Sequence, residues 1–504
     1  MGHKLSLAII FACLIGVTTM REANTAPLSL PLINSDFSSP AIVPPAAWIN
    51  GAKAPGWTYA GNNLDGVGVQ VVSWKPTPTT TFYWNGPDGS ITQIIDPATY
   101  TIKSAGDRYI LLASLGGQGS GTMHETSTLL VDGKAVSTTP MDIVNPVGLA
   151  LAVSVAYTAK PEDVGKSIGV QFAWAKPETQ MQAQVTNVSL AVSPAGTPAP
   201  DGSPADANLR YIGRWDKSDP AIYHSYWSGA YLRMKFIGST VKVNLAAQTA
   251  LAVSIDGAMP AAISAGPGEV DLARAPLKQG YHTIMLGADG QNAEVAFQGF
   301  VLAPGSVTLP IPARRLIEYI GDSITQGNTS YSWRSAEMLD CDHVQIAYSG
   351  CALSSGFGYT NPRKIGFDTQ YFALKNFNHL ADTPQAQWDF SYTPDIIVIN
   401  LGQNEPEEKP DAFVASYARF IQAIHTKFPK TPIAAMQPYS GSHAADVAAA
   451  VARVKKAGDD RVVLINTSGW LVKEDFRDGV HPNDAGAIKA GFLLAEQLQP
   501  LLSK

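Results

Sequence analysis

The hydrophobic pattern of this chain changes near Arg315, and that change most limits the folds that it can adopt. Before Arg315, short apolar runs are separated by Gly, Pro, Asn and Asp, without long helical periodicity. After it, short apolar runs alternate with longer amphipathic segments. The first pattern is typical of β-sandwiches, and the second is typical of a parallel sheet with helices on both faces. The sequence therefore predicts all-β domains followed by an α/β domain.

The α/β region is expected to contain strands at 316–320, 344–347, 395–400, 432–436 and 462–465. The clearest helix between them has an apolar stripe with a 3.6-residue period, formed by Phe413, Val414, Tyr417, Phe420, Ile421, Ile424 and Phe428. Asp484 is expected to cap a last helix that runs to about residue 498. In such a sheet the functional site lies beyond the carboxyl ends of the strands.

The region before Arg315 divides into two expected sandwiches. The length of 504 residues also favours about three domains in all. Residues 27–195 form the first sandwich, in which 35–40 and 55–57 resemble the opening of galactose-binding-like jelly rolls. Residues 196–208 lack any core-forming side chain, which predicts a flexible or partly extended tether. Period-two alternation predicts a second sandwich over 209–307, and the α/β domain then spans 310–504.

The first 26 residues have the pattern of a secretory signal. Lys4 precedes an apolar stretch at 5–17, and small and polar residues follow. This stretch is too short for a comfortable membrane span, and the sequence has no other long uncharged apolar run. We therefore expect a secreted or periplasmic protein without a membrane span in its mature form. A retained N-terminal anchor is the alternative.

Charge and cysteine content exclude several classes of protein. The net charge of −6 gives no reason to expect nucleic acid binding. No Cys/His spacing indicates zinc, so we expect no metal site. We also expect no cofactor and a monomeric chain. Cys341 and Cys351 flank the expected 344–347 strand, and an extended strand would hold them too far apart for a disulfide. We predict free thiols; a chain that doubles back beside this strand would instead allow a bridge.

Polar residues that suit acyl transfer follow three of the expected strands or lie in one late loop. Ser323 follows the first strand, where a helix could begin and offer free N–H groups. Gly350 and Asn404 come shortly after two other strands and could donate N–H groups to an oxyanion. His481 stands three residues after Asp478, a spacing that lets the carboxylate orient the imidazole. Each could alternatively be an ordinary turn or cap residue, but together they form a complete set.

The segments 321–323 (Gly-Asp-Ser), Gly350, 402–404 (Gly-Gln-Asn) and 478–481 (Asp-Gly-Val-His) resemble the conserved blocks of SGNH (GDSL-type) hydrolases. The residues around Asn404 depart from the Thr-Asn-Asp of many members, which bears on the local support of its amide. The segments 211–215 and 227–232 also resemble the small jelly roll of family-2 carbohydrate esterases, which deacetylate xylan and related glycans. The resemblance implies a flavodoxin-like three-layer α/β domain behind that jelly roll.

The same resemblance implies a carbohydrate O-acetylesterase that acts on acetylated polysaccharide or oligosaccharide. Ser323 would be the nucleophile, His481 the general base and Asp478 the orienting acid, although some family-2 members use a Ser-His dyad. The N–H groups of Ser323 and Gly350 and the Asn404 amide would form the oxyanion hole. The alternatives are a lipase or thioesterase of the same fold and a non-catalytic glycan-binding protein.

Other residues near these motifs are weaker candidates. Trp470 and Trp333 flank motif segments and could form a platform for a sugar, or they could belong to the core. His443 follows the fourth expected strand of the α/β region and could reach a substrate, although a solvated loop position is the simpler interpretation. Asp322 is expected to support the turn at Ser323 and to have no catalytic role.

Overall fold

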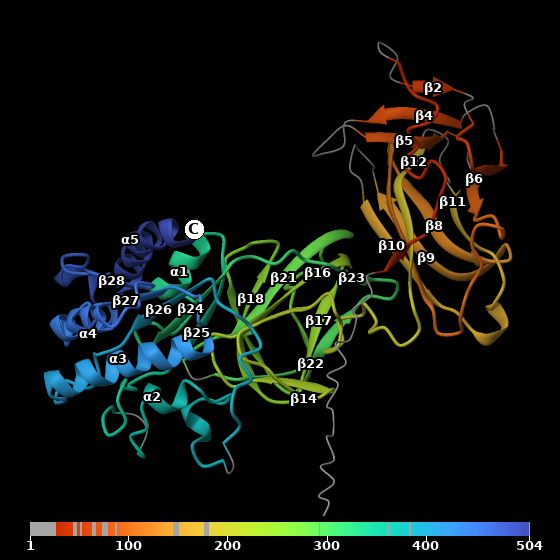
Figure 1. Cartoon of the computed structure of the whole chain (residues 1–504). Coiled ribbons are helices and arrows are strands. Elements are labelled where there is room, and N and C mark those ends of the chain that lie inside the picture. The colour runs from red at the N-terminus through yellow and green to blue at the C-terminus, as the bar shows by residue number, and fades with distance from the viewer. Residues whose placement is uncertain are drawn as a thin grey trace, which may run out of the picture.

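The computed structural model describes residues 27–502 except 44–47, 51–52, 63–66, 73–78, 86–87, 145–150, 176–180, 292, 360–361 and 383–384. The predicted secretory signal, residues 1–26, lies outside the described residues. The described chain forms two β-sandwiches followed by an α/β domain, and the second sandwich lies between the other two parts (Figure 1). In the part of the chain that is described, no helix is both long and apolar enough to cross a membrane.

The first sandwich consists of two antiparallel sheets. One has the order β10-β7-β12-β5-β4-β2, with β1 paired to β12, and the other has the order β3-β6-β11-β8-β9. Phe37 and Trp57, from the two segments with the jelly-roll resemblance, are buried with their ring centroids 5.1 Å apart. The strands are β1 Leu28–Ser29, β2 Trp48–Asn50, β3 Thr58–Gly61, β4 Val67–Val72, β5 Thr79–Trp84, β6 Asp88–Ile94, β7 Arg108–Gln118, β8 Thr122–Val131, β9 Lys134–Val144, β10 Leu151–Thr158, β11 Ile168–Ala175 and β12 Gln182–Ser193.

The second sandwich is also antiparallel, with sheet orders β13-β16-β21-β18-β19 and β14-β15-β22-β17-β20 and with β23 paired to β16. Strand β17 buries every second side chain, those of Val241, Val243 and Leu245, which is the alternation visible in the sequence. The strands are β13 Arg210–Ile212, β14 Asp216–Asp219, β15 Ile222–Ser225, β16 Tyr231–Gly238, β17 Val241–Leu245, β18 Thr249–Ile255, β19 Ala261–Ala265, β20 Gly268–Asp271, β21 Gly280–Ala288, β22 Val295–Leu302 and β23 Val307–Leu309.

The tether predicted between the sandwiches is wrong, because its second half is bound to the second sandwich. The carbonyl groups of Gly202 and Pro200 accept hydrogen bonds from the N–H groups of Phe300 and Thr308, at 2.7 and 2.9 Å. Asp206 is buried and accepts a hydrogen bond of 2.6 Å from the Thr308 hydroxyl. The segment is held through its backbone and one carboxylate, which a composition without core-forming residues does not reveal.

The α/β domain contains a parallel sheet with the order β25-β24-β26-β27-β28. Helices α1 and α5 cover one face, where Ile317 and Tyr319 point, and α3 and α4 cover the other (Figure 1). The predicted strands and the helix around Phe413 are confirmed. The elements are β24 Leu316–Gly321, α1 Tyr331–Met338, β25 Asp342–Ala347, α2 Phe367–Gln370, β26 Ile396–Asn400, α3 Pro410–Lys427, β27 Ile433–Met436, α4 Ala444–Lys456, β28 Val462–Ile465 and α5 Asp484–Leu502. Short 3-10 helices lie in this domain at Phe377–His379 and Lys473–Asp475, and another lies in the first sandwich at Pro161–Asp163.

The cap of α5 differs by one residue from the prediction. Asp484 is the first residue of the helix, and the side-chain oxygen of Asn483 accepts the hydrogen bond from the N–H of Gly486 at 2.9 Å. Asn is as good an N-cap as Asp, so the sequence Asn483-Asp484 offers two possible starts. With Asn483 as the N-cap, the Asp484 carboxylate lies in the first turn, where its negative charge interacts favourably with the positive end of the helix dipole.

The second sandwich and the α/β domain share one buried core. Trp227 and Tyr231 of the sandwich belong to the same apolar cluster as Ile346 and Phe367 of the α/β domain. Arg214 is completely buried at this boundary, where its guanidinium donates hydrogen bonds to the carbonyl groups of Tyr371 and Ala373, at 2.5 and 2.8 Å. The two parts therefore form one structural unit.

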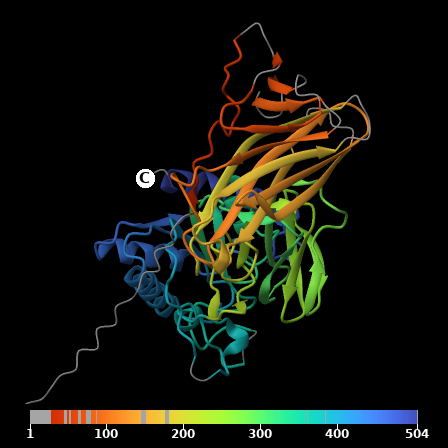
Figure 2. The same cartoon turned by 90° about the vertical axis from the view of Figure 1, so that its right-hand side faces the viewer.

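The first sandwich contacts that unit more lightly. The Ser154 hydroxyl donates to the carbonyl of Gly305 at 2.5 Å, and the Gln279 amide donates to the carbonyl of Ala152 at 2.9 Å. Strand β10 supplies this contact, and β16 and β21 face it. Figure 2 shows the first sandwich in front of the second, on the side away from the helices.

Candidate active site

Ser323 lies in a tight turn at the carboxyl end of β24. Gly321 is required before it, because a Cβ atom there would lie 2.0 Å from the Thr325 hydroxyl oxygen. The Asp322 carboxylate accepts a hydrogen bond from the N–H of Ile324 at 2.9 Å. The backbone carbonyl of Asp322 accepts another from the backbone N–H of Gln326 at 3.2 Å. Asp322 therefore supports the turn, as predicted, and the turn presents the Ser323 side chain at the sheet edge.

The helix predicted to begin near Ser323 does not form. The first helix starts eight residues later at Tyr331, with Ser330 as its N-cap. Gly327 lies between, with a φ of 108° that breaks the helical path after a single turn. The free N–H groups near Ser323 consequently belong to an isolated turn rather than to a helix N-terminus.

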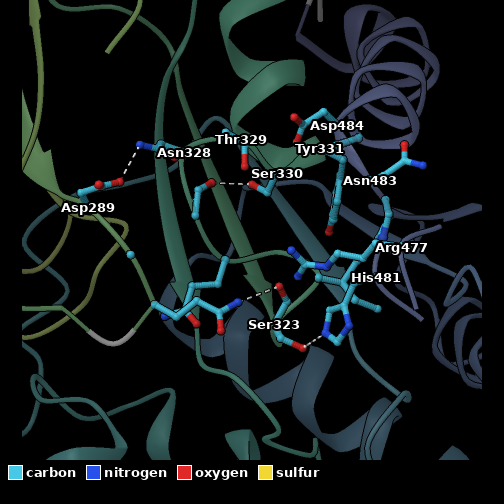
Figure 3. Close-up of a pocket in the computed structure, with 17 residues that line it drawn as sticks. Asp289, Ser323, Asn328, Thr329, Ser330, Tyr331, Arg477, His481, Asn483 and Asp484 are labelled. Atoms are coloured by element: carbon cyan, nitrogen blue, oxygen red, sulfur yellow. Dashed lines mark hydrogen bonds between the residues drawn. The ribbon is translucent and has the colours of Figure 1, made fainter. Parts of the chain in front are cut away.

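The structure brings Ser323, His481 and Asp478 into one hydrogen-bonded chain. The Ser323 hydroxyl lies 2.8 Å from Nε2 of His481, and Nδ1 of His481 lies 2.8 Å from Oδ2 of Asp478 (Figure 3 shows the first of these). Backbone N–H groups of His481 and Val480 donate to the other oxygen of Asp478 at 2.8 and 3.0 Å. These two hydrogen bonds, that of His481 first, lower the pKa of Asp478 to about 2, so the carboxylate stays ionised at neutral pH.

Gly350 and Asn404, the other residues expected to donate to an oxyanion, lie in the loops that follow β25 and β26. Gly350 has a φ of 72°, a backbone conformation that favours glycine. No hydrogen bond to another described residue engages the N–H groups of Ser323 or Gly350. The Asn404 amide nitrogen donates to Oδ2 of Asp322 at 3.0 Å and to the carbonyl of Cys351 at 3.1 Å. Asn404 thus connects the loops that follow β24, β25 and β26.

The Asp322 carboxyl group, next to Ser323 in the turn, is buried, and this burial raises its pKa to about 6. The Asn404 amide and the N–H of Ile324 bind its two oxygens. The carboxyl group therefore holds the turn and the amide together and makes no contact with the Ser323 hydroxyl among the described hydrogen bonds.

Ser323 and His481 lie between two cavities of about 520 and 860 Å³. Asp289 and Gln291, from the turn between β21 and β22 of the second sandwich, line the smaller one with Asn328 and Arg477 (Figure 3). Tyr359, Gln403, Asn404 and Ser440 line the larger one.

The second sandwich directly contacts the turn that carries Ser323. The Gln291 amide donates to the carbonyl of Ser323 at 3.3 Å, and the Asn328 amide donates to the Asp289 carboxylate at 3.0 Å. Sequence reasoning missed Asp289 and Gln291, because a polar turn after a strand looks the same wherever it lies in the fold.

Both tryptophans proposed as a sugar platform lie elsewhere. Trp333 is only 5% exposed and packs against His343, with ring centroids 4.3 Å apart. Trp470 is half-buried near Tyr439, with ring centroids 6.4 Å apart, and neither tryptophan lines the two cavities. The helical and loop positions that place them next to the motifs in sequence turn their rings into the core.

His443, Cys341 and Cys351 are held within the fold by packing or hydrogen bonds. The His443 ring lies 2.7 Å from the Asp446 carboxylate and 2.8 Å from the Glu405 carbonyl, and it stacks on Phe413, so it does not reach for substrate. Cys341 and Cys351 are free and buried on either side of β25, which confirms the prediction from strand geometry.

Two family models match the part of the chain that carries this site. Residues 211–312 match carbohydrate esterase 2 N-terminal, and residues 319–487 match the GDSL-like lipase/acylhydrolase family. The chain therefore resembles the family-2 carbohydrate esterases in carrying these two domains one after the other. Carbohydrate esterases of the GDSL type are serine esterases, which agrees with the arrangement around Ser323.

Individual family-2 relatives show the same relationship. The cellulase/esterase CelE of Acetivibrio thermocellus is 29% identical over 255 residues, which are 45% of this chain and 30% of that protein, so the chain spans less than a third of this curated relative. A family-2 carbohydrate esterase from Clostridium thermocellum, solved in complex with cellohexaose, is 25% identical over 58% of this chain and 99% of its own, with a TM-score of 0.52. An acetyl xylan esterase from the rumen bacterium Butyrivibrio proteoclasticus, 20% identical over 59% of this chain and 96% of its own, shares the fold with a TM-score of 0.51.

Proposed function

We propose that this chain is a carbohydrate O-acetylesterase that works through an acetyl-serine intermediate. The observation that carries the proposal is the chain of hydrogen bonds from Ser323 through His481 to Asp478, placed between two solvent-accessible cavities. A serine beside a neutral imidazole is a weak nucleophile made strong by proton removal, which is the basis of acyl transfer in serine hydrolases.

In the first half-reaction, the Ser323 oxygen attacks the acetyl carbonyl carbon while Nε2 of His481 takes its proton. The N–H groups of Ser323 and Gly350 stabilise the negative oxygen of the tetrahedral intermediate. The Asn404 amide is the third donor and shares the N–H that it gives to the Cys351 carbonyl. Losing one such donor typically costs about 3–4 kcal/mol of transition-state stabilisation.

The intermediate collapses when His481 returns the proton to the sugar oxygen, which leaves as a hydroxyl group. In the second half-reaction, a water molecule attacks the carbonyl carbon of the acetyl-serine while His481 takes one of its protons. The bond from that carbon to the Ser323 oxygen then breaks, His481 returns the proton to Ser323, and acetic acid leaves and ionises in solution. Asp478 holds the imidazole in one orientation and stabilises its protonated form throughout. His481 thus carries every proton in the cycle.

The lining of the smaller cavity favours a sugar over a long acyl chain. The smaller cavity offers carboxylate, amide and guanidinium groups from Asp289, Gln291, Asn328 and Arg477, which suit hydroxyl groups. A lipase or thioesterase would need an apolar pocket for its acyl chain. One related esterase was solved in complex with cellohexaose and another is an acetyl xylan esterase, which supports a glycan substrate. Export from the cell and glycan binding by the first sandwich are part of the same proposal.

The test is hydrolysis of p-nitrophenyl acetate and p-nitrophenyl octanoate, followed by acetate release from acetylated xylan. We expect acetate to be the better substrate, and we expect Ser323→Ala and His481→Ala each to lose nearly all activity, since nucleophile and base act as a unit. The exposed Ser468→Ala and the remote His124→Ala, whose imidazole lies 2.6 Å from Asp142, are matched controls. More than about a tenth of the wild-type rate in either catalytic variant would refute the assignment.

The contribution of Asp478 is measured by Asp478→Asn. Half of this carboxylate side chain is exposed, so we expect a smaller loss of kcat than in His481→Ala. An equal loss would make the carboxylate indispensable and exclude a dyad.

A further inference from the structure

Glu405 follows Asn404 directly and is completely buried. One of its carboxyl oxygens, Oε1, accepts a hydrogen bond of 2.9 Å from the N–H of Leu353. The other, Oε2, has no hydrogen-bond partner among the described residues. Burying a carboxyl oxygen without a hydrogen-bond partner costs folding free energy, so its presence in a folded protein calls for an explanation.

Asn404 and Glu405 together bind the loop that carries Gly350. The Asn404 amide donates to the carbonyl of Cys351, and Glu405 accepts from the N–H of Leu353, so consecutive residues of one loop bind alternate residues of the other. On its other side, Leu353 is bound to α2, because its backbone carbonyl accepts a hydrogen bond of 2.9 Å from the backbone N–H of Asp368. The side chains of Asn404 and Glu405 therefore together hold this loop against the loop that follows β26.

The charges around Glu405 oppose its ionisation. The carboxyl groups of Asp322 and Glu408 raise its pKa further, and the N–H of Glu408 donates to the Glu405 carbonyl in the same turn at 2.9 Å. His443 faces the Glu405 carbonyl, but its other ring nitrogen is already bound to Asp446. Among the ion pairs of the described residues, none includes Glu405. Burial is the main cause that raises the pKa of Glu405 to about 8.

We propose that Glu405 is a positioning residue that acts as a neutral carboxylic acid and holds the loop after Gly350 in the geometry that the oxyanion donors need. This proposal rests on the esterase function proposed above. Glu405 touches neither substrate nor Ser323 and works through the Gly350–Leu353 loop and Asn404. Its neutrality lets it lie beside Asp322 and Glu408 without repelling them.

The protonation state has two consequences with defined signs. The folded protein binds this proton more tightly than the unfolded chain, in which the pKa is near 4.5. Stability linked to Glu405 is therefore fully present below pH 4.5 and is lost as the pH rises toward about 8. Above about pH 8 the folded protein must ionise Glu405 beside two other acidic groups, so the loop shifts and kcat falls.

The experiment compares Glu405→Gln, Glu405→Ala and the exposed neighbour Glu407→Gln with wild type, between about pH 6 and pH 9, on p-nitrophenyl acetate. Glutamine keeps an acceptor for the Leu353 N–H and cannot ionise. We expect Glu405→Gln to keep kcat within about threefold at neutral pH and to lose the alkaline fall, and Glu405→Ala to lose at least about tenfold in kcat with KM little changed. Glu407→Gln should match wild type.

Two results would overturn the proposal. One is an alkaline fall in Glu405→Gln equal to that of wild type, which decides the matter even if Glu405→Ala does not fold. The other is a folded Glu405→Ala with wild-type kcat. The melting temperature gives a readout independent of activity, since that of wild type should fall more steeply than that of Glu405→Gln from about pH 5 to pH 8. Equal slopes refute the neutral acid, whereas an inactive wild type with unequal slopes refutes only the esterase function.

Discussion

The two β-sandwiches share an architecture but differ in how they join the α/β domain. Each consists of two antiparallel sheets around its own apolar core. The second also contributes Trp227, Tyr231 and the buried Arg214 to a core that it shares with the parallel sheet. The first contacts the rest through hydrogen bonds such as that of Ser154. The comparison teaches that attachment, rather than fold, decides whether a sandwich belongs to the catalytic unit.

Arg214 shows how strong the inner attachment is. Its guanidinium lies 4.1 Å from the ring centroid of Trp388, and its charge faces the buried Glu318 carboxyl. Tyr371 and Tyr392 donate hydrogen bonds to the two oxygens of Glu318, at 2.6 and 2.5 Å. Nε and Nη2 of Arg214 have no hydrogen-bond partner among the described residues, so the aromatic rings stacked on the guanidinium and the facing Glu318 carboxyl group are what offset its buried charge.

Replacing Arg214 by alanine should have the largest effect, because it leaves Glu318 without its counter-charge and opens a void in the shared core. We expect the free energy of unfolding of the catalytic unit to fall by about 3–5 kcal/mol. Urea denaturation followed by tryptophan fluorescence measures it. The half-exposed Arg314→Ala, which loses only a surface pair with Asp340, is the control and should change stability by less than about 1 kcal/mol. Equal effects would remove the distinction between the two attachments.

Asp206→Ala tests the segment between the sandwiches. The Asp206 carboxylate accepts hydrogen bonds from the N–H groups of Gly202 and Asn208, both at 2.8 Å, and from Thr308 at 2.6 Å. We expect a loss of about 2–3 kcal/mol, since the change leaves buried donors unsatisfied. The exposed Asp201→Ala is the matched control. A stability equal to that of the control would mean that the segment is a tether after all.

Ser154→Ala removes one hydrogen bond of the outer attachment. We expect the free energy that joins the first sandwich to the second to fall by only about 0.5–1.5 kcal/mol. Limited proteolysis between the sandwiches, with and without the substitution, measures the change. Release of the first sandwich as an independent body by this single change would show an even weaker attachment, whereas no change would show that other contacts dominate.

Removal of the first sandwich should have the smallest effect on catalysis. A chain that begins at Ala199 keeps Pro200 and Gly202, which pair with the second sandwich. We expect its kcat on p-nitrophenyl acetate to stay within about twofold of wild type, because no described residue of the first sandwich lines either cavity. A much lower kcat would place the first sandwich in the catalytic unit and erase the comparison.

The parts that could be predicted from the sequence depend on local patterns. The strands of the parallel sheet are short apolar runs, and parallel topology brings their carboxyl ends to one edge, so Ser323, Gly350 and Asn404 could be placed together in advance. The Asp478–His481 pair is likewise local, since His481 comes three positions after Asp478 and a hydrogen bond of 2.8 Å joins them.

What could not be predicted depends on contacts between distant segments. In the sequence, nothing distinguishes Arg214 from an ordinary surface arginine. Its position follows from the fold, which brings the carbonyl groups of Tyr371 and Ala373, 157 and 159 residues later, within hydrogen-bond distance. Gln291 becomes part of the site only because the second sandwich docks beside Ser323. The tryptophans were misplaced for the same reason, because nearness to a motif in sequence does not determine the direction in which a ring points.

The turn between β21 and β22 lets substrate choice diverge separately from chemistry. It forms one wall of the smaller cavity, yet Ser323, His481 and Asp478 all come from the other domain. Insertions, deletions or exchanges in a surface turn are among the changes that a fold tolerates best. The shape of one wall of the site can therefore change through a few residues of a neighbouring domain, while the residues around Ser323 stay the same.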